Sequence, residues 1–369
     1  MDLKDKKIAI VCDWIKDWWW AELVLSHLLE IFPDADIYTS VFYQEWNPIF
    51  EWRNIHTSFI QKIPFLGKKH KLALFLRPQA FESFDLSEYD IVISSTSAES
   101  KWVITKPSCL QVCYCHTPTR YFWSHYEEYL KMMEFGILNP LVRFLMPKFI
   151  KSLRKWDLVA SMRPDAYIAN SKNVQKRISK YYERESEVIY PGIDISEFKL
   201  GNKKFDFYLS VGRCIPYKQF ELLVDTFNQN GKKLILVTNT ENKLYRKLKK
   251  KSNSNIEWKL SISRQETLNL YSEAKAFIFP PEEDFWIVPL EAMSSWTPVI
   301  AYKKWWALET VIDGKSGLFF TEQTVASLSE AINKFQTMKW DTKLIRKHAE
   351  KFDKKIFQKQ IQNFITKNI

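Results

Sequence analysis

Two kinds of hydrophobic pattern alternate along the whole chain. Short runs of β-branched and other apolar residues are followed by longer segments with the 3.6-residue spacing of amphipathic helices. This alternation predicts parallel sheets covered by helices. A helix is expected from about 21 to 31, and the basic tail 341–369 also has a helical pattern. The runs expected to form strands are 7–12, 37–39, 91–94, 110–114, 166–169, 205–211, 233–237, 276–279 and 298–301.

A polar stretch at 199–204 interrupts the pattern before a new series of strands begins. The 369 residues suit two domains of about 150 to 200 residues each. We therefore expect one doubly wound domain over 1–200 and a second over 201–349, with a helix at about 350–369 packing back on the first. Because open α/β sheets bind ligands at the carboxyl ends of their strands, the active site is expected in a cleft between the two domains.

The composition is that of a globular protein, with 46% hydrophobic and 26% charged residues. No apolar run approaches the roughly 20 residues that span a bilayer, and the N-terminus has no secretory signal pattern, so a cytoplasmic location is expected. The five cysteines lie mostly in or beside apolar runs, which favours buried thiols over disulfides. The sequence Cys113-Tyr114-Cys115-His116 has no second cluster to complete a four-ligand metal site.

The formal net charge of +11 favours an anionic partner. The segments 65–77 and 141–151 mix bulky apolar and basic residues, a composition that suits contact with lipid headgroups at the inner membrane face. Helices packed on their own domain with basic outer faces would look the same, so both interpretations stay open. The basic residues are dispersed without a nucleic-acid-binding motif, so nucleic acid is not an expected partner.

A loop with anion-binding chemistry follows the first strand of the second domain. Gly212-Arg213-Cys214-Ile215-Pro216-Tyr217-Lys218 precedes a helix, which places Arg213 and Lys218 between strand and helix. An arginine can chelate phosphate through its planar fork while a lysine adds a point charge, so the pair could neutralise a diphosphate without metal. Two solvated surface charges remain the simpler alternative.

This loop and the downstream pair Glu283 and Glu291 together resemble the retaining glycosyltransferases of family 4, which have the GT-B fold of two Rossmann-like domains facing across a cleft. The resemblance extends over nearly the whole chain. Within the family, the sequence resembles a mannosyltransferase-like branch that builds surface polysaccharides. The further segments that carry it are Asp13-Trp14, Ala21-Glu22, Cys113–Pro118 with Arg120-Tyr121, and Ala169-Asn170-Ser171.

The resemblance implies a role for each of these residues. Arg213 and Lys218 would hold the donor diphosphate, Glu291 would accept hydrogen bonds from the ribose, and Glu283 would contact the hexose. His116 would face the sugar from the N-terminal domain, as a catalytic residue with Glu283. Transfer would occur on the front face of the sugar, with the departing phosphate oxygen deprotonating the acceptor, and neither a metal nor another cofactor is expected.

Tryptophan stands where the family has glycine. The chain has 15 Trp and 8 Gly, whereas about 7% glycine, or roughly 26 residues, is average for this length. Indoles at such loops would fill space that the donor needs. We hypothesise that UGA codons read as glycine in the source were translated as tryptophan. The donor-site positions concerned are Trp19, Trp20, Trp286 and Trp305-Trp306, the last pair just before Glu309, itself an expected donor-binding residue. Single family glycines are matched by Trp102 and Trp296.

The sequence therefore predicts a retaining, metal-independent hexosyltransferase. Its donor would be a GDP- or UDP-sugar, with mannose favoured, and its acceptor a lipid-linked or polysaccharide glycan. The alternative is an inactive GT-B-like binding module whose donor pocket is blocked by tryptophan. A dinucleotide oxidoreductase is less favoured, because no G-x-G-x-x-G follows the first strand of either domain.

Overall fold

The computed structural model describes residues 3–16, 20–45, 47–64, 67, 73–124, 126, 139–201, 203–282, 287–304 and 307–369. By internal contacts the chain divides into an N-terminal unit, Met1–Tyr190 with Phe357–Ile369, and a C-terminal unit, Pro191–Ile356. The division falls between Tyr190 and Pro191, whereas the sequence placed the boundary between 200 and 201.

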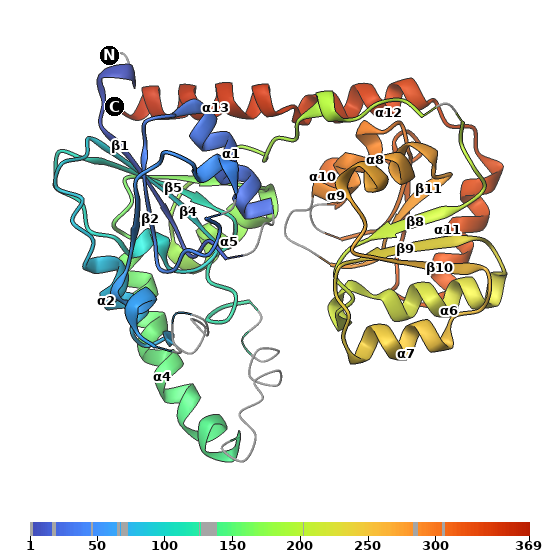
Figure 1. Ribbon diagram of the computed structural model, residues 1–369, viewed down its shortest axis with the longest axis horizontal. Helices are drawn as coiled ribbons and strands as arrows, with labels where there is room; N and C mark the ends of the chain where they lie inside the picture. The colour runs from blue at the N-terminus through green and yellow to red at the C-terminus, as the bar shows by residue number, and fades with distance from the viewer. Residues whose placement is uncertain are drawn as a thin grey trace. The chain divides into compact units, whose positions relative to one another are not determined.

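The N-terminal unit contains a parallel sheet, in which the described strands follow the order β3-β2-β1-β4-β5-β6-β7 (Figure 1). The strands are β1 (Ile8–Cys12), β2 (Asp36–Thr39), β3 (Ile55–Thr57), β4 (Ile91–Thr96), β5 (Leu110–Cys115), β6 (Ala166–Ala169) and β7 (Glu187–Val188). The helices are α1 (Trp20–Ile31), α2 (Arg77–Glu82), α4 (Asn139–Ala160) and α5 (Lys172–Tyr182), joined at the end of the chain by α13 (Lys354–Asn368) from Phe357 onward.

The central strands β1, β4, β5 and β6 of this sheet are buried on both faces, which explains their apolar runs. In β1 the residues Ile8, Ile10 and Cys12 face one core, while Ala9 and Val11 face another, as the two-residue period of a strand requires. The first core also receives one apolar stripe of α13, which lies beside α1 in Figure 1. This stripe has the i, i+4, i+7, i+8 spacing of a buried helix face and consists of Phe357, Ile361, Phe364 and Ile365.

The C-terminal unit repeats the same design. Its described strands form a parallel sheet of order β10-β9-β8-β11-β12-β13, with α6 and α7 on one face and α8 and α9 on the other (Figure 1). The strands are β8 (Tyr208–Val211), β9 (Leu234–Thr238), β10 (Ile256–Leu260), β11 (Ala276–Phe279), β12 (Val299–Tyr302) and β13 (Gly317–Phe320). The helices are α6 (Phe220–Asn230), α7 (Lys243–Lys251), α8 (Arg264–Glu273), α9 (Ile287–Ser294), α10 (Ala307–Thr310), α11 (Val325–Thr337) and α12 (Thr342–Ala349).

These sheets confirm the predicted α/β class with two doubly wound units. Each predicted strand run coincides with an observed strand, although β8 begins at Tyr208, later than the predicted start at 205. All five cysteines are buried and free of disulfides, as predicted. Among the described helices, none combines the length and apolar character needed to cross a membrane.

Three described tryptophans outside the donor loops occupy different environments. Trp102 is fully buried, donates a hydrogen bond from Nε1 to Asp157 Oδ1 at 2.9 Å and stacks on Phe122. Trp296 and Trp52 instead have positive φ angles of 57° and 65°. This left-handed region favours glycine and is unfavourable for a bulky side chain. The backbone therefore supports a glycine at Trp296 and at Trp52, whereas the packing of Trp102 suits an indole.

Replacing Trp52 by glycine should stabilise the protein. Trp52 is 94% exposed, so its indole loses little packing when removed. Relief of the left-handed strain should raise the free energy of unfolding by about 1 kcal/mol, measured by urea denaturation. The adjacent Glu51, which is exposed and has an ordinary φ of −60°, provides the control. Glu51→Gly should lower stability by about 0.5 to 1 kcal/mol, and equal effects of the two changes would contradict the prediction.

Candidate active site

The carboxyl ends of the strands in the C-terminal unit carry the predicted donor residues. The strand order reverses between β8 and β11, the place where open α/β sheets bind their ligands. Arg213 and Lys218 follow β8, Glu291 lies in α9 after β11, and Glu309 lies in α10 after β12. Because all these strands are parallel, the four residues come from connections at one edge of the sheet.

The backbone groups of the loop after β8 form hydrogen bonds to the backbone and side chains of neighbouring segments. Gly212 N donates to Val237 O at 3.0 Å, and Cys214 N donates to Thr238 Oγ1 at 3.1 Å. The amide of Asn242 donates to Cys214 O at 2.7 Å. The loop carrying Arg213 is thus anchored to the end of β9 and to the start of α7, which fixes its path along the sheet edge.

Arg213 and Lys218 meet at Tyr217. The Arg213 Nη2 donates to the Tyr217 hydroxyl at 3.0 Å, and the Lys218 Nζ lies 5.0 Å from the centre of the Tyr217 ring. Arg213 is half-buried, and Lys218 is only 2% exposed. Lysine is rarely buried to this extent on a solvated surface, so the geometry argues against a pair of ordinary surface charges.

Glu291 is held at both carboxylate oxygens. Oε1 accepts from Arg264 Nη1 at 2.6 Å, and Oε2 accepts from the Tyr271 hydroxyl at 3.0 Å. Its side chain is 13% exposed. Arg264 and Tyr271 both lie on α8 and were not among the residues predicted from the sequence. Their spacing of seven residues, two helical turns, places them on one face of α8 and is the one sequence signal that could have linked them.

Several predicted residues lie outside the described part of the chain. They are Glu283, Trp19, Trp286, Trp305 and Trp306. Trp20 begins α1, but its side chain is likewise outside the description. The roles implied for these residues stay predictions.

In the N-terminal unit one carboxylate organises the corresponding edge of the sheet. Asp13 follows β1 and is buried. It accepts hydrogen bonds from Thr96 Oγ1, from the hydroxyl and backbone N–H of Ser97, and from the backbone N–H groups of Glu99 and Ser100 at 2.6–3.1 Å. The motif Asp13-Trp14 contributed to the family resemblance, and its physical effect is to fasten the loop after β4 to the loop after β1.

His116 follows β5 and is a buried, neutral imidazole. Its Nε2 lies 2.9 Å from the Ser95 hydroxyl, while its Nδ1 has no hydrogen-bond partner among the described residues. Burial lowers the pKa of His116 to about 4, and the nearby Asp13 only partly offsets this effect. At neutral pH His116 can therefore exchange a hydrogen bond with a ligand, but it carries no positive charge.

A second buried acid lies close to this edge. Glu99 is fully buried and binds the guanidinium of Arg77 at 2.7 Å, while Arg77 also lies 5.1 Å from the Trp14 ring. Burial raises the pKa of Glu99 to about 7, with Arg77 acting in the opposite direction. This pair was not predicted from the sequence, because the two residues are distant in sequence and only the fold brings them together.

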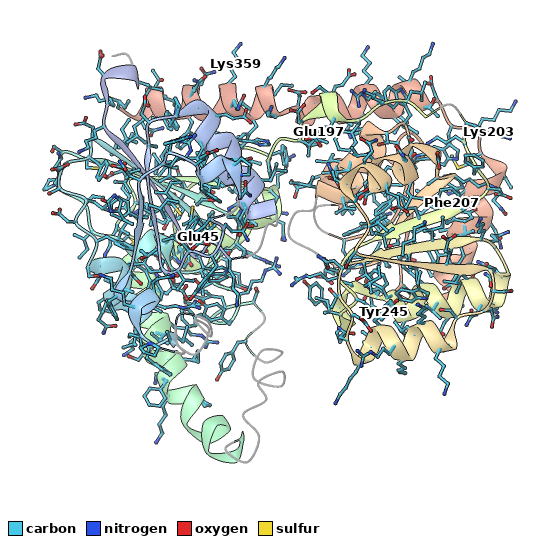
Figure 2. All side chains as sticks on the ribbon, viewed as in Figure 1. Glu45, Glu197, Lys203, Phe207, Tyr245 and Lys359 are labelled. Atoms are coloured by element: carbon cyan, nitrogen blue, oxygen red, sulfur yellow. The ribbon has the colours of Figure 1, made fainter. Side chains whose placement is uncertain are left out.

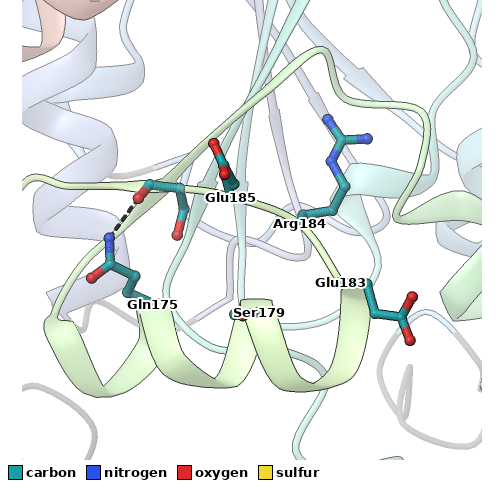
Figure 3. A pocket seen from close by; sticks show the side chains of 6 residues that line it. Gln175, Ser179, Glu183, Arg184 and Glu185 are labelled. Atoms are coloured by element: carbon teal, nitrogen blue, oxygen red, sulfur yellow. Dashed lines mark hydrogen bonds between the residues drawn. The ribbon is translucent and has the colours of Figure 1, made fainter.

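A pocket of about 570 Å³ lies elsewhere in the N-terminal unit (Figure 3). The amide of Gln175 donates to Ser186 O across it at 2.6 Å. Because α5 runs back from the carboxyl end of β6, its last turn lies at the opposite edge of the sheet from His116. The pocket is lined by Gln175, Ser179, Glu183, Arg184, Glu185 and Ser186, none of which was predicted to bind donor.

Comparisons with known families match both units. The family described as Glycosyltransferase Family 4 matches residues 21–197, and the family described as Glycosyl transferases group 1 matches residues 193–358. The two matches together cover the chain from residue 21 to residue 358. The chain belongs to the family 4-like glycosyltransferases of the GT-B class.

Solved structures of GT-B glycosyltransferases share this fold. The Anabaena protein HepE, crystallised in complex with UDP, superposes with a TM-score of 0.71 at 18% identity, covering 98% of this chain and 100% of that one. At this identity the similarity concerns the fold alone. It agrees with the two parallel-sheet units described above.

Curated relatives of this glycosyltransferase include mannosyltransferases. The alpha-1,3/1,6-mannosyltransferase of Saccharomyces cerevisiae is 26% identical over 250 residues, covering 52% of this chain and 48% of that protein. The O-antigen chain mannosyltransferase of Salmonella typhimurium is 30% identical over 145 residues, covering 35% and 40%. The chain thus spans about half the length, or less, of these relatives.

The burial of neutral His116 predicts a pH-dependent stability. The pKa of His116 is lowered from 6.5 to about 4 in the folded chain, so the neutral imidazole favours folding fully above pH 6.5, and this stabilisation is lost as the pH falls toward 4. The free energy of unfolding of the wild type should therefore fall by up to about 3 kcal/mol over this range, and His116→Asn should abolish that fall, as measured by urea denaturation at a series of pH values. Parallel curves for wild type and variant would contradict the prediction.

Proposed function

We propose that this glycosyltransferase moves a hexose from a nucleotide diphosphate sugar to a lipid-linked or polysaccharide acceptor, with retention of configuration and without a metal ion. The observation that carries the proposal is the placement of two cations, Arg213 and Lys218, on the connection beside the strand-order reversal of the C-terminal unit. Family membership and the mannosyltransferases among the relatives support a sugar-transfer reaction and favour mannose.

The donor diphosphate would be held by cationic side chains. The planar fork of Arg213 suits two phosphate oxygens, and Lys218 adds a point charge. As the glycosidic bond breaks, negative charge grows on the departing phosphate, and fixed positive charges stabilise it. A low exposure such as that of Lys218 strengthens this attraction, because less water screens it.

The remaining contacts would select the nucleoside and the sugar. Glu291 offers carboxylate lone pairs to the ribose hydroxyls, and Glu309 would contribute to the same donor site from α10. Glu283, outside the described residues, would bind hydroxyls of the hexose. His116 would give a neutral hydrogen bond to the sugar, with its unpartnered Nδ1 as the available atom.

The chemical step would take place on one face of the sugar. The departing diphosphate oxygen would take the proton of the acceptor hydroxyl while that hydroxyl bonds to the anomeric carbon, so no carboxylate nucleophile is required. A retaining hydrolase, in contrast, places two carboxyl groups about 5 Å apart around the bond. A GDP- or UDP-sugar fits the proposed donor, and the UDP complex of HepE is an example of a bound uridine nucleotide in this fold.

An inactive binding module was the alternative suggested by the tryptophans. The comparisons give it no support, since the named relatives are glycosyltransferases. The five donor-site indoles belong to segments or side chains outside the described structure, so the question is best decided by restoring glycine.

Glycine restoration should yield a protein that binds donor. We expect the five-glycine variant, with Trp19, Trp20, Trp286, Trp305 and Trp306 changed to glycine, to be stabilised against heat by a GDP- or UDP-sugar and to hydrolyse or transfer it. Arg213→Ala in the same background should weaken donor binding by about 10- to 100-fold, the loss of a charge-assisted phosphate contact. If neither the wild type nor the five-glycine variant binds any nucleotide sugar, the binding-module alternative is favoured.

We also propose that the N-terminal unit contacts an anionic membrane face through α4. Phe75 and Phe149 are 43% and 46% exposed, and their rings meet edge to face with centroids 4.9 Å apart. The exposed lysines Lys148, Lys151 and Lys155 also lie on α4. Exposed aromatic rings beside lysines suit the boundary between headgroups and acyl chains, where each basic residue contributes about 1 kcal/mol near an anionic surface.

Charge reversal on α4 should weaken binding to anionic vesicles. We expect changing Lys148, Lys151 and Lys155 to glutamate to reduce co-sedimentation with phosphatidylglycerol vesicles at least tenfold. The control is the same charge change on α5, at the exposed Lys172, Lys176 and Lys180, which should have a much smaller effect. Equal losses from both triple variants would show a dependence on net charge alone and would contradict a role for α4.

A further inference from the structure

The carboxylate of Glu291 is oriented by two donors from α8. Arg264 occupies Oε1 at 2.6 Å and Tyr271 occupies Oε2 at 3.0 Å. A carboxylate offers about four lone-pair positions, so two donors leave two positions for further hydroxyl groups. The two hydroxyl groups of a ribose would donate to these two remaining positions.

The Arg264 guanidinium is itself fixed from its other side. Its Nη2 donates to Glu197 Oε2 at 3.0 Å, and its central carbon lies 5.5 Å from the centre of the Phe198 ring. Glu197, labelled in Figure 2, belongs to the short helical turn Ile195–Glu197 of the same unit. Arg264 is thus oriented by one carboxylate and one ring while it holds a second carboxylate, that of Glu291.

Tyr271 is a permanent donor at this position. Burial raises the pKa of Tyr271 well above its ordinary value, and the nearby Glu291 acts in the same direction. The phenol therefore stays protonated throughout the ordinary pH range. Its hydroxyl proton remains available to Glu291 Oε2.

We propose that Arg264 and Tyr271 are positioning residues of the donor site, which hold the Glu291 carboxylate in the orientation that receives the ribose of a nucleotide sugar. The inference rests on the proposed function, in which Glu291 binds that ribose. A free glutamate side chain loses up to about 2 kcal/mol of rotamer entropy when it is ordered. Ordering it before the donor arrives removes this cost from binding.

The test uses the wild type or the five-glycine variant, whichever binds donor. Arg264→Gln and Tyr271→Phe should each raise the KM for the nucleotide sugar about tenfold while kcat changes less than about twofold, because the ribose is remote from the bond that breaks. Arg246→Gln is the matched control, since it removes an arginine paired with a carboxylate, Glu241, in the same unit. It should leave both constants unchanged.

A double-mutant cycle with Glu291→Ala separates positioning from a direct or purely structural role. If Arg264 acts through Glu291, adding Arg264→Gln to Glu291→Ala should raise KM no further. A full additional increase, or a wild-type KM for both Arg264→Gln and Tyr271→Phe, would overturn the inference. Thermal melting of each variant checks folding, and the mild Tyr271→Phe change keeps the test informative if Arg264→Gln is unstable.

Failure of the proposed function gives a different result. In that case neither folded parent protein binds a nucleotide sugar, and the inference falls with it. A parent that binds donor, with variants that bind it equally well, overturns the positioning role alone.

Discussion

The parallel arrangement of the strands is the constraint on which the described structure depends. When every strand of a sheet points the same way, every strand-to-helix connection leaves from one edge. The strand order reverses at β1 and β4, and again at β8 and β11, which is where open α/β sheets bind their ligands. The residues that follow these strands lie at the same edge of their own sheet because of the topology, although they are far apart in the sequence. Asp13 fixes the local geometry of its edge through five hydrogen bonds, and Glu291 is held by two, one at each carboxylate oxygen.

The fold could be predicted from the sequence because the central strands of each sheet are buried on both faces. Runs such as 276–279 and 166–169 are continuously apolar, and the structure has strands at those positions. The edge strands β3, β7, β10 and β13 were not predicted. The first two have few residues, which are only partly buried and lack an apolar run. Apolar periodicity thus identifies the interior of a sheet better than its margins.

The candidate site could be predicted only in part. Loop residues that follow a strand, such as Arg213 and His116, could be predicted because the local sequence fixes their position relative to the strand. Arg264 and Glu99 are instead paired with side chains from other elements, Glu291 and Arg77, and no local sequence pattern indicates either pair. The tryptophans show a similar limit: their number is anomalous in the sequence, but only the backbone distinguishes Trp296, with its positive φ, from the well-packed Trp102.

A crystal structure with a bound nucleotide sugar tests the central claim most directly. We expect the diphosphate beside Arg213 and Lys218, and the ribose hydroxyls on the carboxylate of Glu291. A nucleotide sugar bound away from the β8 and β11 connections, with these three side chains uninvolved, would contradict the assignment of the donor site.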